Sequence, residues 1–184
     1  MTIIGLTGHS GAGKDTLAES LPRATNVKFS STMKAVAAGI AHHIPVQEGR
    51  YEGDTFAYVI DREGIEGLKG VPGGLDFLKD LGLAMRAQDR DCLVRPTMEK
   101  IDAILAVRDG HALVFVTDVR FPNEASAIRK AGGLLGRVTR PDHESSGGET
   151  ESYIDTMDVD FEIVNDGTPA QLRRRFFEAL DGAR

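Results

Sequence analysis

A glycine-rich segment that ends in Gly13-Lys14-Asp15-Thr16 carries the most recognisable chemistry in this sequence. An apolar run over residues 2–7 precedes it and predicts a buried strand, and apolar residues at helical spacing follow it. A glycine-rich turn between a strand and a helix lets backbone N–H groups surround phosphate oxygens, while the lysine supplies a mobile positive charge. The pattern predicts a nucleotide phosphate site formed by Gly8, Ser10, Gly11, Ala12, Gly13, Lys14, Asp15 and Thr16.

This segment departs from the pattern GxxxxGK[ST] at one position. Asp15 follows the lysine directly, and the hydroxyl group comes one residue later, at Thr16. A carboxylate beside a triphosphate is repulsive unless a metal ion or a substrate proton uses it. Asp15 is therefore a candidate to support a metal ion indirectly or to orient an acceptor. The alternative interpretation of the whole segment is a glycine-rich turn with an ordinary surface lysine.

A second candidate strand delivers a carboxylate. Residues 112–117 form a continuous apolar and β-branched run, as in a central parallel strand, and Asp118 follows it. A strand that ends in Asp beside a P-loop is typical of a Mg²⁺ site. Because the carboxyl ends of parallel strands meet at one edge of a sheet, we expect Asp118 to lie near Lys14, with Thr16 and Asp118 as metal ligands.

Four arginines are candidates to bind phosphate groups, for which the planar guanidinium is well shaped. Arg120 is predicted to lie in the turn before a helix that begins at Pro122, although it could instead be a surface residue paired with Glu124. Arg140 follows a predicted strand over residues 134–139. Arg86 and Arg90 share one face of a predicted helix. They are predicted either to contact a phosphate or a base, or to lie on a face of the helix that is simply exposed to solvent.

Composition excludes several classes of protein. The chain has 184 residues, and this length predicts one domain. Its net charge of −6 argues against a general nucleic-acid binder. The single cysteine excludes an intramolecular disulfide and is consistent with a reducing cytoplasm. No apolar run approaches ~20 residues, so neither a membrane span nor a membrane partner is expected.

Strand and helix patterns alternate, which predicts an α/β fold: a three-layer sandwich with a mostly parallel central sheet. A further strand is predicted over 27–30, a helix from Thr32 to about His43, and an edge strand around 161–163. Residues 45–74 are rich in glycine and charge and are predicted to be a substrate-covering flap or an insertion. Residues 141–152 are predicted to form either a lid-like loop or a solvated surface loop.

The sequence resembles the deoxynucleoside monophosphate kinases of bacteriophages, a branch of the P-loop nucleoside and nucleotide kinases. The resemblance rests on Gly13 to Thr16, on Asp118-Val119-Arg120-Phe121-Pro122-Asn123-Glu124 and on the ending at 160–168. Residues 30–34 look like a degenerate form of the segment that borders the monophosphate site, and residues 78–92 are loosely similar to a mid-chain helix of the family. The resemblance does not extend to residues 45–74.

The resemblance implies one kinase domain over residues 1–184 that uses ATP and Mg²⁺ to convert a deoxynucleoside monophosphate to the diphosphate. It implies catalytic roles for Lys14, Asp15, Arg120 and Arg140, and substrate contacts for Lys34, Arg86, Arg90, Asp118 and Arg120. It places the protein in a host cytoplasm and leaves a homodimer open. Two alternatives remain: a P-loop kinase for another acceptor, of the dephospho-coenzyme A or phosphomevalonate type, and a nucleotide-binding regulator without kinase activity.

Overall fold

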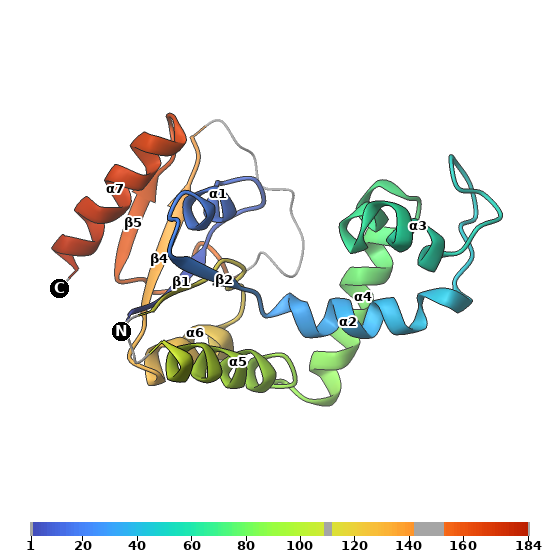
Figure 1. Cartoon of the computed structure of the whole chain (residues 1–184), viewed down its shortest axis with the longest axis horizontal. Helices are drawn as coiled ribbons and strands as arrows, with labels where there is room; N and C mark the ends of the chain where they lie inside the picture. Colours follow the sequence, from blue (N-terminus) through green and yellow to red (C-terminus); the bar gives the residue numbers. More distant parts are fainter. Residues whose placement is uncertain (1, 109–111, 142–152, 184) are drawn as a thin grey trace. The chain divides into compact units, whose positions relative to one another are not determined.

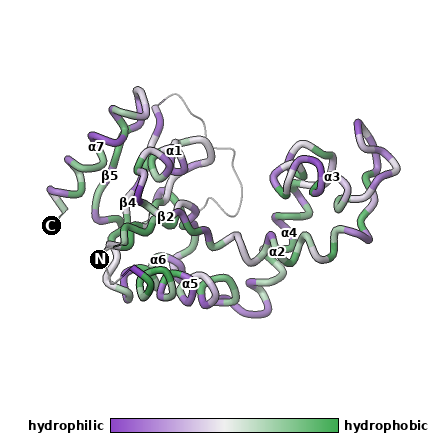
Figure 2. The backbone as a smooth tube through the Cα atoms, in the orientation of Figure 1, coloured by the Kyte–Doolittle hydropathy of each residue, from purple (hydrophilic) through white to green (hydrophobic). Residues whose placement is uncertain are grey.

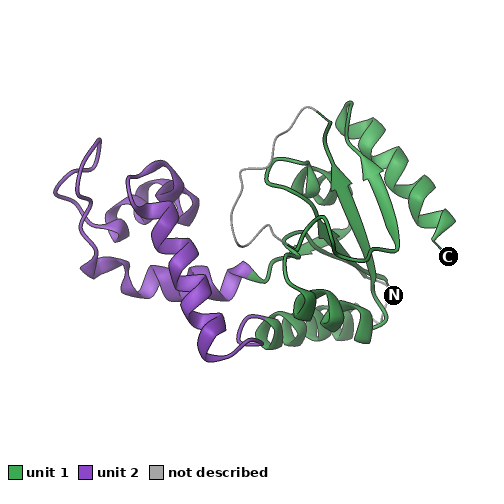
Figure 3. Cartoon of the chain, turned by 180° about the vertical axis from the view of Figure 1, so that it is seen from behind, with its two compact units in different colours: residues 1–29, 94–184 green, residues 30–93 purple. Residues whose placement is uncertain are grey.

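The computed structural model describes residues 2–108, 112–141 and 153–183. The chain divides into two compact units (Figure 3): one comprises residues 1–29 and 94–184, and the other comprises residues 30–93. Whether the two act as a single kinase domain stays a prediction. Among the described residues, no helix is long and apolar enough to cross a membrane.

The first unit is built on a sheet of five strands in the order β2-β3-β1-β4-β5, and every neighbouring pair is parallel. The strands are β1 (Thr2–Thr7), β2 (Ala24–Val27), β3 (Leu113–Val116), β4 (Leu134–Thr139) and β5 (Phe161–Val164). Strands β1 and β3 are buried on both faces, which explains why both read as continuous apolar runs. The predicted α/β class is confirmed, with a sheet that is entirely parallel.

Helices cover both faces of this sheet (Figure 1). On one face, α5 (Val94–Val107) and α6 (Pro122–Lys130) bury Ile101 and Ile128 against Val114 of β3. On the other face, α1 (Lys14–Glu19) and α7 (Pro169–Gly182) bury Leu17 and Phe176 against Phe115. The hydropathy colouring shows hydrophobic and hydrophilic stretches in turn along α5 and α6 (Figure 2), as expected of helices with one buried side.

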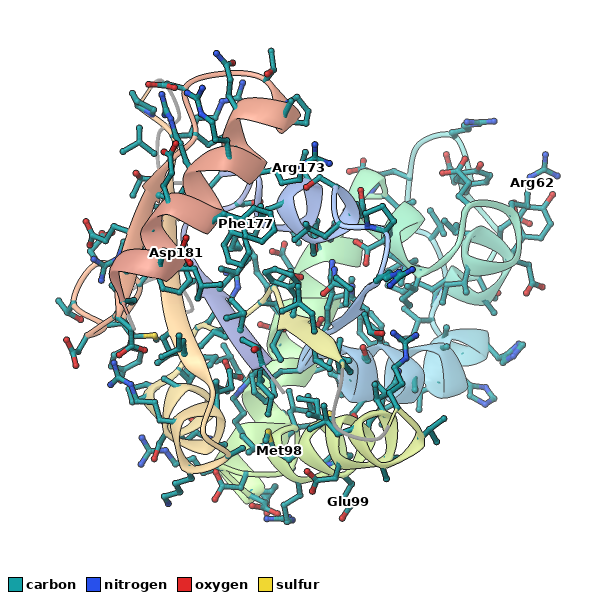
Figure 4. All side chains as sticks on the ribbon, turned by 60° about the vertical axis from the view of Figure 1, so that its left-hand side comes forward. Arg62, Met98, Glu99, Arg173, Phe177 and Asp181 are labelled. Carbon is teal, nitrogen blue, oxygen red and sulfur yellow. The ribbon has the colours of Figure 1, made fainter. Side chains whose placement is uncertain are left out.

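Helix α7 shows how local sequence signals define an element. The side chain of Thr168 accepts a hydrogen bond from the backbone of Gln171, and Pro169 occupies the first helical position. Figure 4 shows Arg173, Phe177 and Asp181 following one another along this helix, on a side where Phe177 remains 45% exposed.

Strand β2 is one element whose predicted boundary differs from the structure. It ends at Val27, and not at Ser30, because Ser30 already begins a helix. Helix α5 begins at Val94, so Pro96 lies inside its first turn. Proline is tolerated there because the first backbone N–H groups of a helix have no partner within the helix.

The second unit is helical and has its own core. Its elements are α2 (Ser30–Ile40), η1 (Ala41–His43), α3 (Phe56–Glu63), η2 (Ile65–Gly70) and α4 (Gly74–Gln88). Its fully buried side chains are Ala37, Ala41, Val59 and Leu68. Two apolar residues of α2, Val36 and Ile40, are 40% and 42% exposed.

Residues 45–74 are more ordered than their composition indicates. They contain α3 and η2, and the hydroxyl of Thr55 caps the start of α3 by accepting a hydrogen bond from the backbone of Tyr58. Phe56 and Val59 of α3 are buried in the core of this unit. The sequence analysis missed this helix because glycines surround its short apolar pattern. Its role as a substrate cover stays a prediction, and of the lid-like loop predicted over 141–152 only Pro141 lies within the described residues.

Candidate nucleotide site

The carboxyl ends of all five parallel strands lie at one edge of the sheet, and a polar residue or the glycine-rich loop follows each of them. In the order of the sheet these are Lys28 after β2, Asp118 after β3, the loop 8–13 after β1, Arg140 after β4 and Asn165 after β5. Ligands of open α/β sheets bind at this edge. The topology therefore gathers residues that are far apart in the sequence.

The loop has a backbone that only glycine accommodates at two positions. Gly8 and Gly13 have φ angles of 138° and 104°, which L side chains rarely adopt. A Cβ atom at Gly8 would lie 2.2 Å from the carbonyl oxygen of Val138, and one at Gly13 would lie 2.3 Å from Nδ2 of Asn165. The loop is therefore pressed against its neighbours on one side, while Ser10 and Gly11 remain exposed on the other.

Lys14 lies folded over this loop. Its Nζ atom donates hydrogen bonds to the carbonyl oxygens of Gly8 (2.6 Å) and His9 (2.8 Å). The positive φ angles, the glycine positions that a Cβ would fill and the ammonium above the loop together make a cradle that fits a phosphate group. The residues present thus fit the nucleotide that the motif predicts.

Asn165 is a site residue that the sequence analysis did not identify. Its Nδ2 atom donates a hydrogen bond of 2.8 Å to the carbonyl oxygen of Ala12, which ties the carboxyl end of β5 to the loop. A cavity of about 240 Å³ lies here, lined by Gly11, Gly13, Thr16, Arg140, Asn165, Gly167, Pro169 and Leu172. The structure therefore brings Arg140 and Thr16 to the wall of one cavity beside the loop.

Asp15 turns away from the cavity and toward β2 and β3. Its Oδ2 atom lies 2.8 Å from Nζ of Lys28, and its Oδ1 atom accepts hydrogen bonds from Thr117 (2.5 Å) and Asn26 (3.1 Å). Burial by itself raises the pKa of Asp15, but the hydrogen bonds from Lys28, Thr117 and Asn26 outweigh it and lower the pKa below its ordinary value. Asp15 is therefore a carboxylate, and both of its oxygens are engaged by protein groups.

Asp118 and Thr16 are the predicted metal ligands. The Oδ1 atom of Asp118 accepts a hydrogen bond of 2.8 Å from the backbone of Phe29, which fixes the carboxylate at the sheet edge. Hydroxyl and carboxylate oxygens suit Mg²⁺, which usually takes only one or two carboxylates and completes its shell with water and substrate phosphates. Within the described ranges no group of three or more His, Cys, Asp or Glu residues could hold a metal ion. The metal-binding role of both residues stays a prediction.

Arg120 lies in a turn that Glu124 stabilises. The side chain of Glu124 is only 1% exposed, and its Oε2 atom accepts hydrogen bonds from the backbone of Arg120 (2.8 Å) and Phe121 (3.1 Å). This carboxylate caps the start of α6 and fixes the chain path between Asp118 and the helix. The catalytic role of Arg120 stays a prediction.

The other predicted substrate residues belong to the second unit. Lys34 forms an ion pair with Glu66, which also pairs with Lys69 at 2.6 Å. Burial raises the pKa of Glu66, but the hydrogen bonds from Lys34 and Lys69 lower it from 4.5 to about 2. Arg86 donates a hydrogen bond to the carbonyl oxygen of Gly82 within α4, and Arg90 follows the end of that helix. Their contacts with a substrate stay predictions.

Residues 154–157 form hydrogen bonds with the loop and with β4. Nε2 of His9 lies 3.0 Å from Oδ1 of Asp155, and Arg137 donates to the backbone carbonyls of Ile154 (3.3 Å), Asp155 (3.3 Å) and Met157. The sequence analysis gave Arg137 no such role. No pattern in the sequence indicates these contacts, because the partners come from separate parts of the chain.

Comparisons with known proteins identify the fold. No family model matches the chain. It is 30% identical over 82 residues to a mimivirus protein (Acanthamoeba polyphaga mimivirus) named "Putative deoxynucleotide monophosphate kinase", and this match spans 43% of the chain and 42% of the relative, less than half of either. The dephospho-CoA kinase of Campylobacter jejuni aligns with 97% of the chain and 95% of its own length, at 12% identity and a TM-score of 0.50. A variant of the APS kinase CysC of Mycobacterium tuberculosis aligns over 98% of the chain and 96% of its own length, at 14% identity and a TM-score of 0.42. The chain therefore has the α/β fold of the P-loop kinases.

Proposed function

We propose that this protein is an ATP-dependent kinase that transfers the γ-phosphoryl group of ATP to a deoxynucleoside monophosphate and forms ADP and the diphosphate. The observation that carries the proposal is the cradle formed by the loop 8–13 and Lys14, with a cavity beside it. The similarity to a protein named as a deoxynucleotide monophosphate kinase supports the acceptor class.

The donor nucleotide occupies the loop and the cavity. Backbone N–H groups of the loop and the Lys14 ammonium hold the β- and γ-phosphates, and Lys14 can exchange its bonds to two carbonyl oxygens for bonds to phosphate. The cavity of about 240 Å³ is smaller than the ~300–1,000 Å³ of pockets for drug-sized ligands, so it suits the base and sugar end of the nucleotide. Arg140, on its wall, is placed to contact the donor.

Phosphoryl transfer demands positioning and charge neutralisation more than covalent chemistry. Thr16 and Asp118 would hold Mg²⁺, which neutralises phosphate charge when bound. Arg120 orients the acceptor phosphate with its planar guanidinium and stabilises the transferring group. No strong general base is needed, because the attacking atom is already an anionic phosphate oxygen. Lys34, Arg86 and Arg90 are proposed to contact the acceptor.

The test is ADP release from ATP and Mg²⁺ with a panel of deoxynucleoside and ribonucleoside monophosphates, dephospho-coenzyme A and phosphomevalonate. The Lys14→Ala protein, purified identically, is the control for contaminating kinases. Release stimulated by particular deoxynucleoside monophosphates supports the proposal. Stimulation only by dephospho-coenzyme A or phosphomevalonate would replace the acceptor class, and tight ATP binding without stimulated release would indicate a nucleotide-binding regulator.

A further inference from the structure

Lys28 is a charged residue at the nucleotide edge of the sheet that the motifs do not single out. We propose that Lys28, held in place by Asp15 and Thr117, binds the anionic phosphate of the acceptor, and that Asp15 is the residue that positions it. This inference rests on the proposed function and deepens it, because it assigns the acceptor side of the same site.

The position of Lys28 follows from the sheet. Strand β2 pairs in parallel with β3, with Val27 opposite Val116, so Lys28 and Thr117 follow the two strands at the same level. The next residue, Phe29, donates its backbone N–H to Asp118 over 2.8 Å. Lys28 therefore lies beside the predicted metal ligand, with a side chain that is 33% exposed and within reach of a ligand.

The contacts of Asp15 fix the ammonium group of Lys28. The Oδ2 atom of Asp15 lies 2.8 Å from Nζ of Lys28, while Thr117 and Asn26 hold the Oδ1 atom of the same carboxylate. A lysine side chain has many rotamers. Because Oδ1 of Asp15 is held by Thr117 and Asn26, the ion pair with Oδ2 restricts the position of the Lys28 ammonium. Because Asp15 immediately follows Lys14, its side chain connects the phosphate loop to Lys28.

The pairing also resolves a charge conflict. An aspartate beside the lysine of a phosphate loop would repel a triphosphate. The ion pair with Lys28 neutralises Asp15 and leaves the ammonium hydrogens that do not face Asp15 available for a second anion, because an ammonium has three donors. A phosphate group is an anion of suitable size and charge for this position.

The direction of phosphoryl transfer places the acceptor on this side. The attacking and leaving oxygens lie roughly in line through the transferred group. The cavity for the donor is lined by residues after β4 and β5, whereas Lys28 follows β2, and the loop after β1 lies between them in the order of the sheet. An acceptor opposite the donor therefore approaches over β2 and β3, where Lys28 lies.

The competing interpretation is that Lys28 serves only as a counter-ion for Asp15, and three variants separate the two. We expect Lys28→Met to raise the acceptor KM about 10- to 100-fold, the loss typical of one hydrogen bond to a charged group, and to raise the Kd for ATP by a smaller factor, because Asp15 loses its counter-ion. Asp15→Asn keeps the positive charge of Lys28 but no longer holds its side chain in an ion pair. We expect this variant to raise the acceptor KM by a smaller factor than Lys28→Met does. The double variant Asp15→Asn with Lys28→Met should be as defective as Lys28→Met.

A counter-ion role predicts the opposite pattern. Lys28→Met would then weaken ATP binding more than acceptor binding, because it leaves the Asp15 carboxylate uncompensated, and the double variant would recover the wild-type values for both. Lys28→Arg, which keeps the charge, should retain most of the acceptor affinity under our proposal. Thr117→Val removes the hydroxyl that contacts both Asp15 and Asn26, but leaves the ion pair of Asp15 with Lys28, and should raise the acceptor KM slightly. Thermal unfolding of each variant checks that it folds, and Lys130→Met, an exposed lysine on α6, is the matched control.

Failure of this inference can be distinguished from failure of the proposed function. If the wild-type protein releases no ADP with any monophosphate, the proposed function is wrong, and the acceptor role of Lys28 is wrong with it. If the wild-type protein is active and the folded Lys28→Met variant has an unchanged acceptor KM, the role of Lys28 alone is overturned.

Discussion

Two lysines of the predicted site, one in each unit, have different partners. In the sheet unit, Lys14 donates to two neutral backbone carbonyls of the loop that is proposed to receive phosphate. In the helical unit, Lys34 is paired with the carboxylate of Glu66, which connects α2 to η2. A phosphate that binds Lys34 must first break its ion pair with Glu66. The partner of a lysine therefore matters as much as its place in a motif.

The units also differ in how they bury apolar residues. The central strands of the sheet unit are buried on both faces and form cores with helices on each side. The helical unit encloses one smaller core with three α-helices and two 3₁₀ turns, and it leaves Val36, Ile40 and Leu75 partly exposed. We expect the helical unit to be the less stable of the two, because it buries less apolar surface.

The largest predicted effect concerns the loop lysine. Lys14→Ala should lower kcat/KM about 100- to 1,000-fold, because it removes the positive charge from the phosphate cradle. Its melting temperature should change little, since the Lys14 side chain lies outside the hydrophobic cores of the sheet unit. Steady-state kinetics and thermal unfolding measure both, with Lys130→Ala as the matched lysine variant. Near-normal turnover in Lys14→Ala would show that the loop 8–13 and Lys14 do not form the phosphate site.

A cavity in the helical core tests the independence of the two units. Leu68 is fully buried, so Leu68→Ala should cost about 2–5 kcal/mol of unfolding free energy. Hydrogen exchange should accelerate in α2, α3 and α4 and stay unchanged in the strands, and ATP binding should persist. Leu75→Ala is the matched control, because Leu75 is 39% exposed. Equal acceleration in the strands of Leu68→Ala would show that the two units unfold together.

The hydrogen bond from Asn165 tests how the loop is held. Asn165→Ala removes the donor to Ala12 and should weaken ATP binding about 3- to 10-fold, as expected for one neutral hydrogen bond. Isothermal titration with ATP measures the affinity, and Gln88→Ala, an exposed amide at the end of α4, serves as control. An unchanged affinity would show that the loop keeps its shape without this contact.

The smallest effect is a pH dependence of the helical unit. The pKa of Glu66 is lowered to about 2 in the folded protein, so its ion pairs stabilise the fold above its ordinary pKa of 4.5, and this stabilisation is lost as the pH falls toward 2. The side chain is 54% exposed, which limits the contribution to about 1 kcal/mol or less.

Glu66→Gln should therefore destabilise the protein at about pH 6 and converge with the wild type only near about pH 2. Urea unfolding at several pH values measures this difference. A destabilisation of the same size across that pH range would assign it to lost packing and not to charge.

The sequence by itself determined the local features of the sheet unit. The loop glycines, the ends of β1 and β4, the proline that starts α6 and the capping box of α7 all follow from φ preferences, apolar periodicity and hydrogen bonds between near neighbours. These signals act over a few residues, so the sequence displays them directly. Helix α3 was not predicted from the sequence, because its apolar pattern is short and lies among glycines.

Only the tertiary structure decided which side chains meet. Asn165 contacts Ala12 across 153 residues of sequence, Thr117 contacts Asp15 across 102, and Lys34 pairs with Glu66 across 32. Parallel strands bring together chain segments that no periodicity relates, because the order of strands in the sheet differs from their order in the sequence. The roles proposed for Asn165, Asp15 and Lys28 depend on that order.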